Sequence, residues 1–395
     1  MLCSLFLVLL QTGDAAPGRV LDVGVALTMD QRRVVRNARI LVRDGRIVAV
    51  GRQDEIEAPE GWEEFSYPDA YAFPGGVDLH SHTQTGGWGD INDMVNPDNP
   101  ELRTLDTIVP GNDLYRDGVA AGVTTVNAIP GSGTNISGAG TLVRLEDTIV
   151  VDEAVLRFPG SVKVAQGYNP ERRQGDLGAT RMGMWYMLRW WLDRAREARD
   201  EPGPHPDVEH LIGIYEEHHP FLVHTAGARD SFGTVRMFQV EAGVPTIVSH
   251  GTFNGYRAAE AMADLGDVAV NLGPRNYDFS FNQMARFVGI VPAYLERGVT
   301  NVSVQTDAPV VPQEEFFLQA ALAERLGADP WEALESINCD PADQIGMGDR
   351  IGRLRPGFDA DVVVKAGPPL DPRTPVLLVW IEGETVYDVR DGQRY

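Results

Sequence analysis

Four of the eight histidines come at the ends of short apolar runs, where a β-strand would end. His80 and His82 lie two apart, and alternate side chains of a strand point the same way, so both imidazoles can reach one ion. His224, His250 and Asp307 end similar runs. Imidazole and carboxylate ligands suit Zn²⁺ and similar divalent ions. One histidine at a strand end is usually structural, but five such residues together predict a metal centre with one or two ions, Zn²⁺ being the expected metal.

The chain uses lysine at only two positions, Lys163 and Lys365, and arginine at its other basic positions. Lys163 lies inside an apolar run, residues 161–165, that is typical of a strand. An ammonium group would be repelled by a metal, but an amine that has taken up CO₂ becomes a carbamate that can bridge two metals. Arginine cannot replace lysine in this role, because its guanidinium stays charged. A carbamylated Lys163 is therefore favoured over the alternative, a buried or rim lysine paired with a carboxylate.

The elements that must position these residues alternate between apolar strand-like runs and helical patterns from residue 75 to residue 344. Such alternation predicts a parallel sheet with crossover helices, and the length suits a (β/α)₈ TIM barrel, whose strand ends converge on one rim. A doubly wound sheet is the alternative, but no GxGxxG motif follows the first strand. The glycine-rich residues 131–140 lack the Lys-Ser/Thr of a phosphate loop and are interpreted as a flexible loop between a strand and a helix.

The two ends of the chain share a different pattern, with short strands and tight turns. Asp44-Gly45 between two apolar runs predicts a hairpin, because glycine readily takes a positive φ. Residues 19–74 together with 345–395 are therefore predicted to form one small β-sandwich domain, which flanks a barrel domain over residues 75–344.

Composition narrows the class of protein. The chain has 395 residues and a formal net charge of −23, which argues against nucleic acids as partners, since binding them needs lysine and arginine. Two cysteines, Cys3 and Cys339, cannot form a disulfide framework. Residues 1–16 resemble a signal peptide without its basic start, so the protein is either exported to the periplasm or cytoplasmic with an irregular terminus. No other segment is a candidate for a membrane span.

Further side chains follow predicted strands and are candidates for substrate contacts: Tyr168, Arg172, Arg173, Arg275 and Tyr277. By contrast, the remaining histidines lie in a polar stretch and are interpreted as solvated: His205, His210, His218 and His219. Trp185, Leu188, Trp191 and Leu192 fall at helical spacing, which predicts a face in the core or in an interface.

Three motifs resemble the amidohydrolase superfamily. They are the first-strand motif Phe73-Pro-Gly-Gly-Val-Asp-Leu-His-Ser-His82, the second-strand motif Gly118-Val-Ala-Ala-Gly-Val-Thr-Thr-Val126, and the return into the β-sandwich, Gly352-Arg-Leu-Arg-Pro-Gly-Phe-Asp-Ala-Asp-Val-Val-Val364. The resemblance covers nearly the whole chain and is closest to the imidazolonepropionase-like and prolidase-like branch.

The resemblance assigns roles to the candidate residues. It implies metal ligands His80, His82, His224, His250 and Asp307, with Lys163 as a carbamylated bridge and Asp307 also as the general base. Lys163-Val-Ala and His224-Thr-Ala also look like the corresponding strands of phosphotriesterases. The chain departs from related sequences at Gly167-Tyr-Asn169, where they have Gly-Glu-Asn, so this loop does not define a substrate.

The sequence thus predicts metal-dependent hydrolysis of an amide or cyclic-amide C–N bond in a small molecule or short peptide. Metal-activated hydroxide would attack the carbonyl, His250 would help to polarise its oxygen, and Asp307 would pass the proton to the leaving nitrogen. The alternatives are an ester, lactone or phosphotriester hydrolase with the same metal centre, a non-catalytic scaffold, and a solute-binding protein. Neither the substrate nor the oligomeric state follows from the sequence, and a homo-oligomer is compatible with it.

Overall fold

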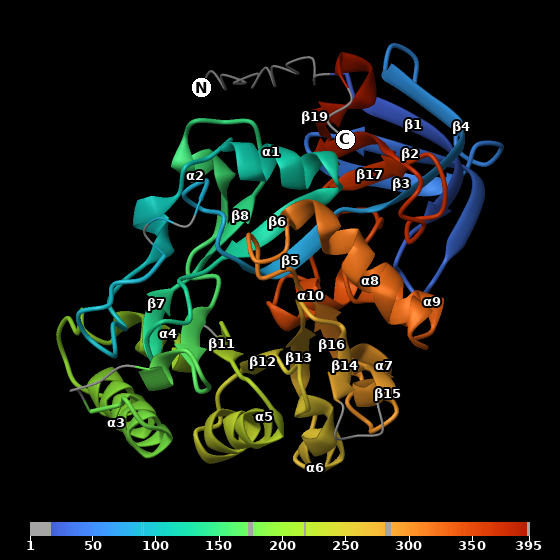
Figure 1. The fold of residues 1–395 in the computed structure, drawn as a ribbon. Helices are drawn as coiled ribbons and strands as arrows, with labels where there is room; N and C mark the ends of the chain where they lie inside the picture. Colours follow the sequence, from blue (N-terminus) through green and yellow to red (C-terminus); the bar gives the residue numbers. More distant parts are fainter. Residues whose placement is uncertain are drawn as a thin grey trace, which may run out of the picture.

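The computed structural model describes residues 17–87, 89, 91–172, 177–216, 219–280 and 286–392. The predicted signal peptide, Arg173 and His218 lie outside these residues. One group of strands comes from the two ends of the chain and lies at the upper right of Figure 1, and the central strands with their helices form the rest of the molecule.

Strands from both ends of the chain share one seven-stranded sheet. Its order is β19-β18-β17-β4-β1-β2-β3, and β4 pairs antiparallel with β17, so the blue and red strands of Figure 1 lie side by side. Its strands are β1 (Arg19–Leu27), β2 (Val34–Arg43), β3 (Arg46–Arg52), β4 (Glu63–Pro74), β17 (Val362–Lys365), β18 (Val376–Ile381) and β19 (Glu384–Asp388). The predicted hairpin between β2 and β3 is present, with Asp44 and Gly45 both at positive φ.

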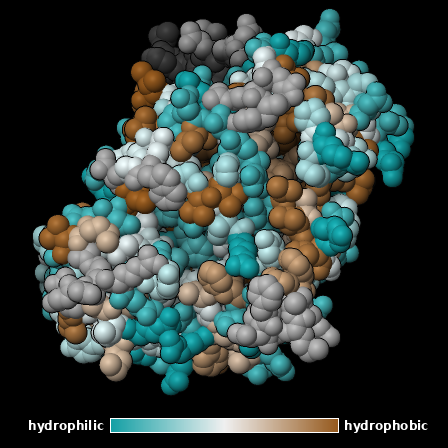
Figure 2. Space-filling model, in the orientation of Figure 1, coloured by the Kyte–Doolittle hydropathy of each residue, from teal (hydrophilic) through white to brown (hydrophobic). Residues whose placement is uncertain are grey.

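Much of this sheet packs into a hydrophobic core of its own, while Val363, Val379 and Ile381 belong to the core of the central strands. The sheet's own core draws on β1 to β4, β17 and β18 and includes Trp380, which meets the Phe65 ring edge-on at 5.0 Å. The hairpin closes against the chain before β17, since Ile47 N–H donates to Phe358 O and Ala360 N–H donates to Gly45 O. Hydrogen bonding joins these seven strands into one sheet. Polar residues predominate on its outer surface at the upper right of Figure 2.

The central strands form a TIM-barrel-like α/β arrangement, which hydrogen bonding divides into two main sheets. The first has the order β16-β13-β12-β11-β10-β7: β16 (Asn301–Val304), β13 (Ala269–Leu272), β12 (Thr246–His250), β11 (Phe221–His224), β10 (Val162–Ala165) and β7 (Ile136–Ala139). The second has the order β5-β6-β8-β9: β5 (Gly76–Ser81), β6 (Val123–Ala128), β8 (Thr141–Arg144) and β9 (Val155–Arg157). A parallel bridge from Ser81 to Ala308 joins one edge of each sheet.

The glycine-rich segment differs from the prediction of a flexible loop. Ile136–Ala139 is the buried strand β7, which runs antiparallel to β10, and β8 follows after Gly140 alone. The backbone approaches another segment closely here, because a Cβ on Gly138 would lie 2.4 Å from Leu102 O, and its φ is +115°. Glycine is therefore required to pack the strand against its neighbour, rather than to make a loop mobile.

Helices cover the outside of the central strands: α1 (Asp113–Ala120), α2 (Val151–Ala154), α3 (Arg181–Arg199), α4 (Glu209–Glu216), α5 (Ala228–Thr234), α6 (Ala259–Ala263), α7 (Ile290–Leu295), α8 (Phe316–Arg325), α9 (Pro330–Glu335) and α10 (Cys339–Gln344). As predicted, Leu188 and Leu192 of α3 are buried in a core that β10 and β11 share. Two antiparallel strands, β14 (Tyr277–Ser280) and β15 (Arg286–Gly289), form a separate ribbon. No described helix is long and apolar enough to cross a membrane.

Candidate metal centre

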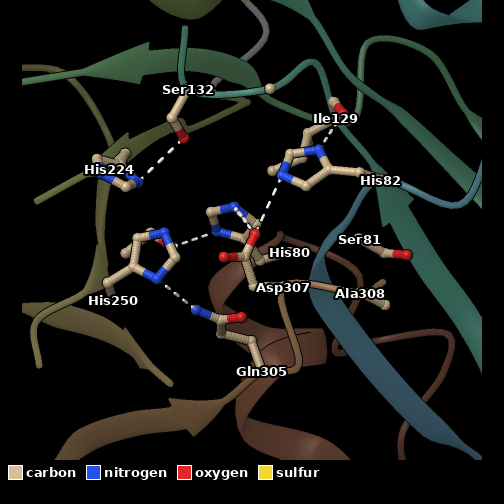
Figure 3. A network of polar contacts seen from close by, with 12 residues as sticks. His80, Ser81, His82, Ile129, Ser132, His224, His250, Gln305, Asp307 and Ala308 are labelled. Carbon is tan, nitrogen blue, oxygen red and sulfur yellow. Dashed lines mark hydrogen bonds and ion pairs between the residues drawn. The ribbon is translucent and has the colours of Figure 1, made fainter. Parts of the chain in front are cut away.

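The predicted ligands meet at the carboxyl ends of the central strands. His80 lies in β5, whereas His224 and His250 are the last residues of β11 and β12. These strand ends lie at one rim, because neighbours in this part of the sheet are parallel. Asp307 was expected to end its strand but lies three residues beyond β16, with a left-handed φ of +53°. Figure 3 shows the four histidines and Asp307 facing one another.

Three ligand atoms are close enough to share one ion. Oδ1 of Asp307 lies 3.3 Å from Nε2 of His80 and 3.2 Å from Nε2 of His82. Two ligands of a tetrahedral Zn²⁺, each about 2.0–2.1 Å from it, lie about 3.3 Å apart. His80 and His82 are buried, and Asp307 is largely buried. The spacing and chemistry of these three groups therefore fit a divalent metal.

The other nitrogen of each histidine has a protein partner, which orients the ring. Nδ1 of His82 donates to Ile129 O at 2.8 Å, and Nδ1 of His250 donates to Gly273 O at 2.8 Å, since a carbonyl only accepts. Nδ1 of His80 lies 2.6 Å from Ser249 Oγ, and Nδ1 of His224 lies 3.0 Å from Ser132 Oγ. Ligand histidines in metalloproteins typically use their second nitrogen in this way.

The orientation leaves Nε2 of these rings as the candidate ligand atom. For His82 and His250 the Nδ1 proton is committed to a carbonyl, so a neutral ring has a lone pair on Nε2. Nε2 of His82 faces the carboxylate of Asp307 at 3.2 Å, an arrangement that either a proton or a metal ion between them can satisfy. Nε2 of His250 is buried and has no hydrogen-bond partner among the described residues. The site therefore has the unsatisfied acceptors that a metal would need.

Asp78, which the sequence analysis did not single out, ties the two halves of this site together. It is fully buried, and its Oδ1 accepts the backbone N–H of His80 at 3.0 Å. Its Oδ2 accepts from Thr306 N at 3.2 Å, Thr306 Oγ1 at 2.6 Å and Gln313 Nε2 at 2.6 Å. One carboxylate thus fixes the backbone beside His80 and the residue before Asp307. Its position two residues before His80 is the signal that could have revealed it.

Lys163 lies among these ligands. It is fully buried, and its Nζ lies 3.0 Å from Nε2 of His80. Burial lowers the pKa of Lys163 to about 7, although the charge of Asp307 opposes the shift. The prediction that Lys163 is carbamylated remains a prediction.

Burial also determines the charge of the other groups. It lowers the pKa values of His80, His224 and His250, and the positive charge of Lys163 acts in the same direction. For Asp307, burial opposes ionisation, but the neighbouring His80 and His82 outweigh it and hold its pKa well below the ordinary range. Burial thus favours the neutral imidazole at His80, His224 and His250, and the neighbouring histidines favour the carboxylate at Asp307; both are the forms that bind metals.

The second pair of histidines extends the site. The His224 and His250 rings have centroids 4.3 Å apart, and the His250 ring lies 4.5 Å from that of His80. Gln305 also reaches His250, with its Nε2 3.0 Å from Nδ1 of the ring. All six predicted ligands therefore lie in one cluster, in which His80 neighbours Lys163, His82, His250 and Asp307.

The candidate substrate residues lie further out. Tyr168 and Tyr277 are exposed, and Tyr168 has a left-handed φ of +63°. Arg275 is also exposed and is held between aromatic rings. Arg172 ends a short 3₁₀ segment, η2 (Pro170–Arg172), and its side chain is outside the described part of the chain.

Among the histidines that were interpreted as solvated, His219 is a correction. It is only 3% exposed, and burial lowers its pKa to about 4. Its imidazole fills the space beside Gly213 of α4, where a Cβ would lie 2.7 Å from the ring. The polar residues around His219 in the sequence gave no sign that its side chain packs against α4.

Comparison with known proteins agrees with this fold and site. The model of the Amidohydrolase family matches residues 207–392. Amidohydrolase tasK of Hapsidospora irregularis is 25% identical over 407 residues, which cover 88% of this chain and 40% of that protein. This chain thus spans less than half the length of that curated relative.

Solved structures cover nearly the whole chain. A crystal structure of an amidohydrolase from Thermotoga maritima MSB8 matches 94% of this chain and 100% of its own, with 27% identity and a TM-score of 0.84. A zinc-bound adenosine deaminase from Xanthomonas campestris matches 95% of this chain and 94% of its own, with 17% identity and a TM-score of 0.55, which shows the shared fold. The fold and the site thus define a class of protein: a TIM-barrel-like protein with a cluster of histidines and an aspartate at its strand ends. The chain matches the amidohydrolase superfamily in sequence and in fold.

Proposed function

We propose that this protein is a metal-dependent hydrolase that cleaves an amide-type C–N bond. The observation that carries the proposal is the convergence of Nε2 of His80, Nε2 of His82 and Oδ1 of Asp307. Members of the amidohydrolase superfamily bind divalent metals, and one zinc-bound relative supports Zn²⁺ as the metal. The curated relative and a solved neighbour are both described as amidohydrolases, which supports the bond class.

The chemistry divides between the metal and the side chains. A divalent metal held by His80, His82 and Asp307 would supply a water of lowered pKa and would polarise the substrate carbonyl. Asp307 is ionised and only partly exposed, so it can accept a proton from a water beside it and return the proton to the leaving nitrogen. His250, with a free Nε2 and its proton on Nδ1, is placed either to bind a second metal or to contact the carbonyl oxygen.

We propose further that Lys163 is carbamylated and bridges two metals. Its Nζ lies 3.0 Å from Nε2 of His80, and its charge acts on His224 and His250. A carbamate there would offer an anionic oxygen to each metal, whereas a plain ammonium would compete with a metal for His80. This supports a two-metal centre with His224 and His250 as ligands of the second ion.

We also propose that the two main central sheets form one closed barrel. β7 and β8 continue into each other through Gly140, and the Ser81–Ala308 bridge joins β5 to the chain beyond β16. The strands of the seven-stranded sheet, with their own core, would form the small β-sandwich domain of residues 19–74 and 345–395.

The test combines metal analysis with an activity screen. Purified protein is expected to contain about one or two divalent metals per chain, which a chelator removes and Zn²⁺ restores. The metal-loaded protein is screened against N-acyl amino acids, dipeptides and cyclic amides, with esters and lactones as the competing bond class. Protein that binds no divalent metal, or that cleaves only esters or lactones, would contradict the proposal.

A further inference from the structure

A hollow of about 460 Å³ lies just beyond the ends of β11 and β12. Ala226 and Gly227 form one side of it, two and three residues past His224. Phe253 and Asn254 form the other side, three and four residues past His250. The two segments that line the hollow thus follow directly after the ligands His224 and His250, which makes it a candidate place for the part of a substrate that does not react.

Phe253 is unusual for an exposed aromatic residue. Its side chain is half exposed, and its φ is +58°, a conformation that bulky residues rarely adopt. Such backbone strain persists where the surroundings enforce it, and it concentrates at binding sites. His250 and Gly251, on the same segment, also have a positive φ. The turn after β12 thus holds the Phe253 ring at the edge of the hollow.

Arg275 lies against this ring. Its guanidinium carbon is 5.9 Å from the centre of the Phe253 ring and 5.3 Å from that of Tyr277, and its Nε donates to Tyr277 O at 3.0 Å. Two rings and one hydrogen bond therefore fix the guanidinium, while its two terminal nitrogens make no hydrogen bond or ion pair with the described residues. Arg275 is also two residues beyond Gly273, whose carbonyl holds His250.

Arg181 and Arg229, the two cations that line the hollow itself, differ from Arg275, which lies beside its Phe253 wall. Arg181 is neutralised by Asp230 and by Glu171, whose Oε1 lies 2.8 Å from its Nε. Arg229 is 75% exposed and approaches Asp230 only at 3.9 Å. In a chain with a net charge of −23, a guanidinium held beside the hollow with no carboxylate partner among the described residues stands out. Its planar pair of terminal nitrogens matches a carboxylate, which it can bind with two parallel hydrogen bonds.

We infer that the substrate carries a free carboxylate on the side away from the scissile bond, and that Arg275 binds it, with Arg229 adding to the local positive charge. The inference rests on the proposed function and specifies its substrate class: N-acyl amino acids and short peptides with a free carboxyl end. Phe253 and Tyr277 are the surfaces that keep the guanidinium in place.

The test compares acids with matched amides. N-acetyl derivatives of glycine, leucine and phenylalanine, and the corresponding carboxamides, are titrated into metal-loaded protein by calorimetry, and kcat/KM is measured for the same pairs. Each acid is expected to exceed its amide by about ten- to a hundredfold, as for a hydrogen bond to a charged group. The preference should weaken as salt rises, because the pair is exposed.

Substitutions test whether Arg275 is the residue that binds the carboxylate. Arg275→Ala and Arg275→Gln should abolish the preference, because they weaken the binding of the free acids and leave that of the carboxamides unchanged. Arg275→Lys should retain part of the preference, because lysine keeps the positive charge but lacks the paired terminal nitrogens of arginine. Arg36→Ala is the matched control, since Arg36 is an exposed arginine of β2 with no ion pair among the described residues. Circular dichroism and metal content verify that each variant is folded and loaded.

The outcomes separate this inference from the proposed function. Hydrolysis of the N-acetyl amino acids and of their carboxamides at equal rates would overturn the inference alone. A preference for the free acids that survives in both Arg275→Ala and Arg275→Gln would do the same. If the free acids bind through Arg275 but no test compound is hydrolysed at its N-acyl bond, the result would count against the proposed function. It would still support the carboxylate site.

Discussion

Replacing Asp78 is expected to weaken metal binding although Asp78 is not one of the proposed ligands. The carboxylate accepts four hydrogen bonds, which connect the backbone of His80 with Thr306 and Gln313. In Asp78→Asn, the amide oxygen can accept the three hydrogen bonds from Thr306 and Gln313, but the amide NH₂ then faces the backbone N–H of His80. The substitution thus removes one hydrogen bond and places two donors together while it keeps the volume constant.

The size of the effect follows from these contacts. An unsatisfied buried donor costs about 1–3 kcal/mol, so Asp78→Asn should lower the free energy of unfolding by about that amount. Asp78→Ala leaves all four donors without their acceptor and should cost several kcal/mol. Loss of groups that orient metal ligands commonly reduces metal affinity by about 10–100-fold, and this range is expected for Asp78→Asn.

The assay measures unfolding by urea and metal affinity by competition with a chelator, both on the same preparations. Asp359→Asn is the matched control, because Asp359 is also a buried carboxylate with several partners, Arg144 and Arg350 among them, but lies at the terminal sheet. It should lower stability without changing metal affinity. If Asp78→Asn and Asp359→Asn reduce stability equally and have the same metal affinity as each other, the proposed link between Asp78 and the metal ligands is refuted.

Three further predictions concern other parts of the molecule. Lys163→Ala should lose one of two metals by elemental analysis, and Lys163→Arg should do no better although it keeps the charge; full metal content in Lys163→Arg would refute the bridging carbamate. Burial raises the pKa of Asp361 to about 7, so the unfolded chain, with a carboxyl pKa of about 4, loses this proton first, and stability falls as pH rises from about 4 to about 7. Asp361→Asn should therefore flatten that part of the stability profile in urea unfolding, with an unchanged slope as the contrary result. Trp380→Ala removes a fully buried ring and should cost about 3–5 kcal/mol of unfolding free energy with unchanged metal content per folded chain, whereas a loss of metal would show that the terminal sheet supports the site.

Much of the site could be predicted because strand ends and side-chain types are local properties. His80, His82, His224 and His250 each follow an apolar run, and parallel strands bring such positions to one edge of a sheet whatever the details of packing. The hairpin at Asp44-Gly45 was predictable for the same reason, since two residues with positive φ define the turn by themselves.

The failures have a common physical origin in contacts between segments that are distant in the chain. Gly131–Gly140 was interpreted as a loop because glycine is frequent in loops, but the close approach of Leu102 requires glycine within β7. His219 was interpreted as solvated because its neighbours in sequence are polar, but α4 packs over it. In both cases the residue type reflects a neighbour that sequence spacing does not reveal.

The amino-acid sequence by itself determined which residues can bind a metal, because ligand chemistry is a property of the side chain and strand periodicity fixes which way it faces. Only the tertiary structure decided how those residues are held. Asp78 joins β5 to the chain beyond β16 across more than 200 residues, Ser132 and Ser249 orient His224 and His80, and the ring of Phe253 holds Arg275 beside the hollow. These partners are ordinary polar and aromatic residues with no local pattern, and their roles arise only when the folded chain brings them within hydrogen-bond or ring-contact distance.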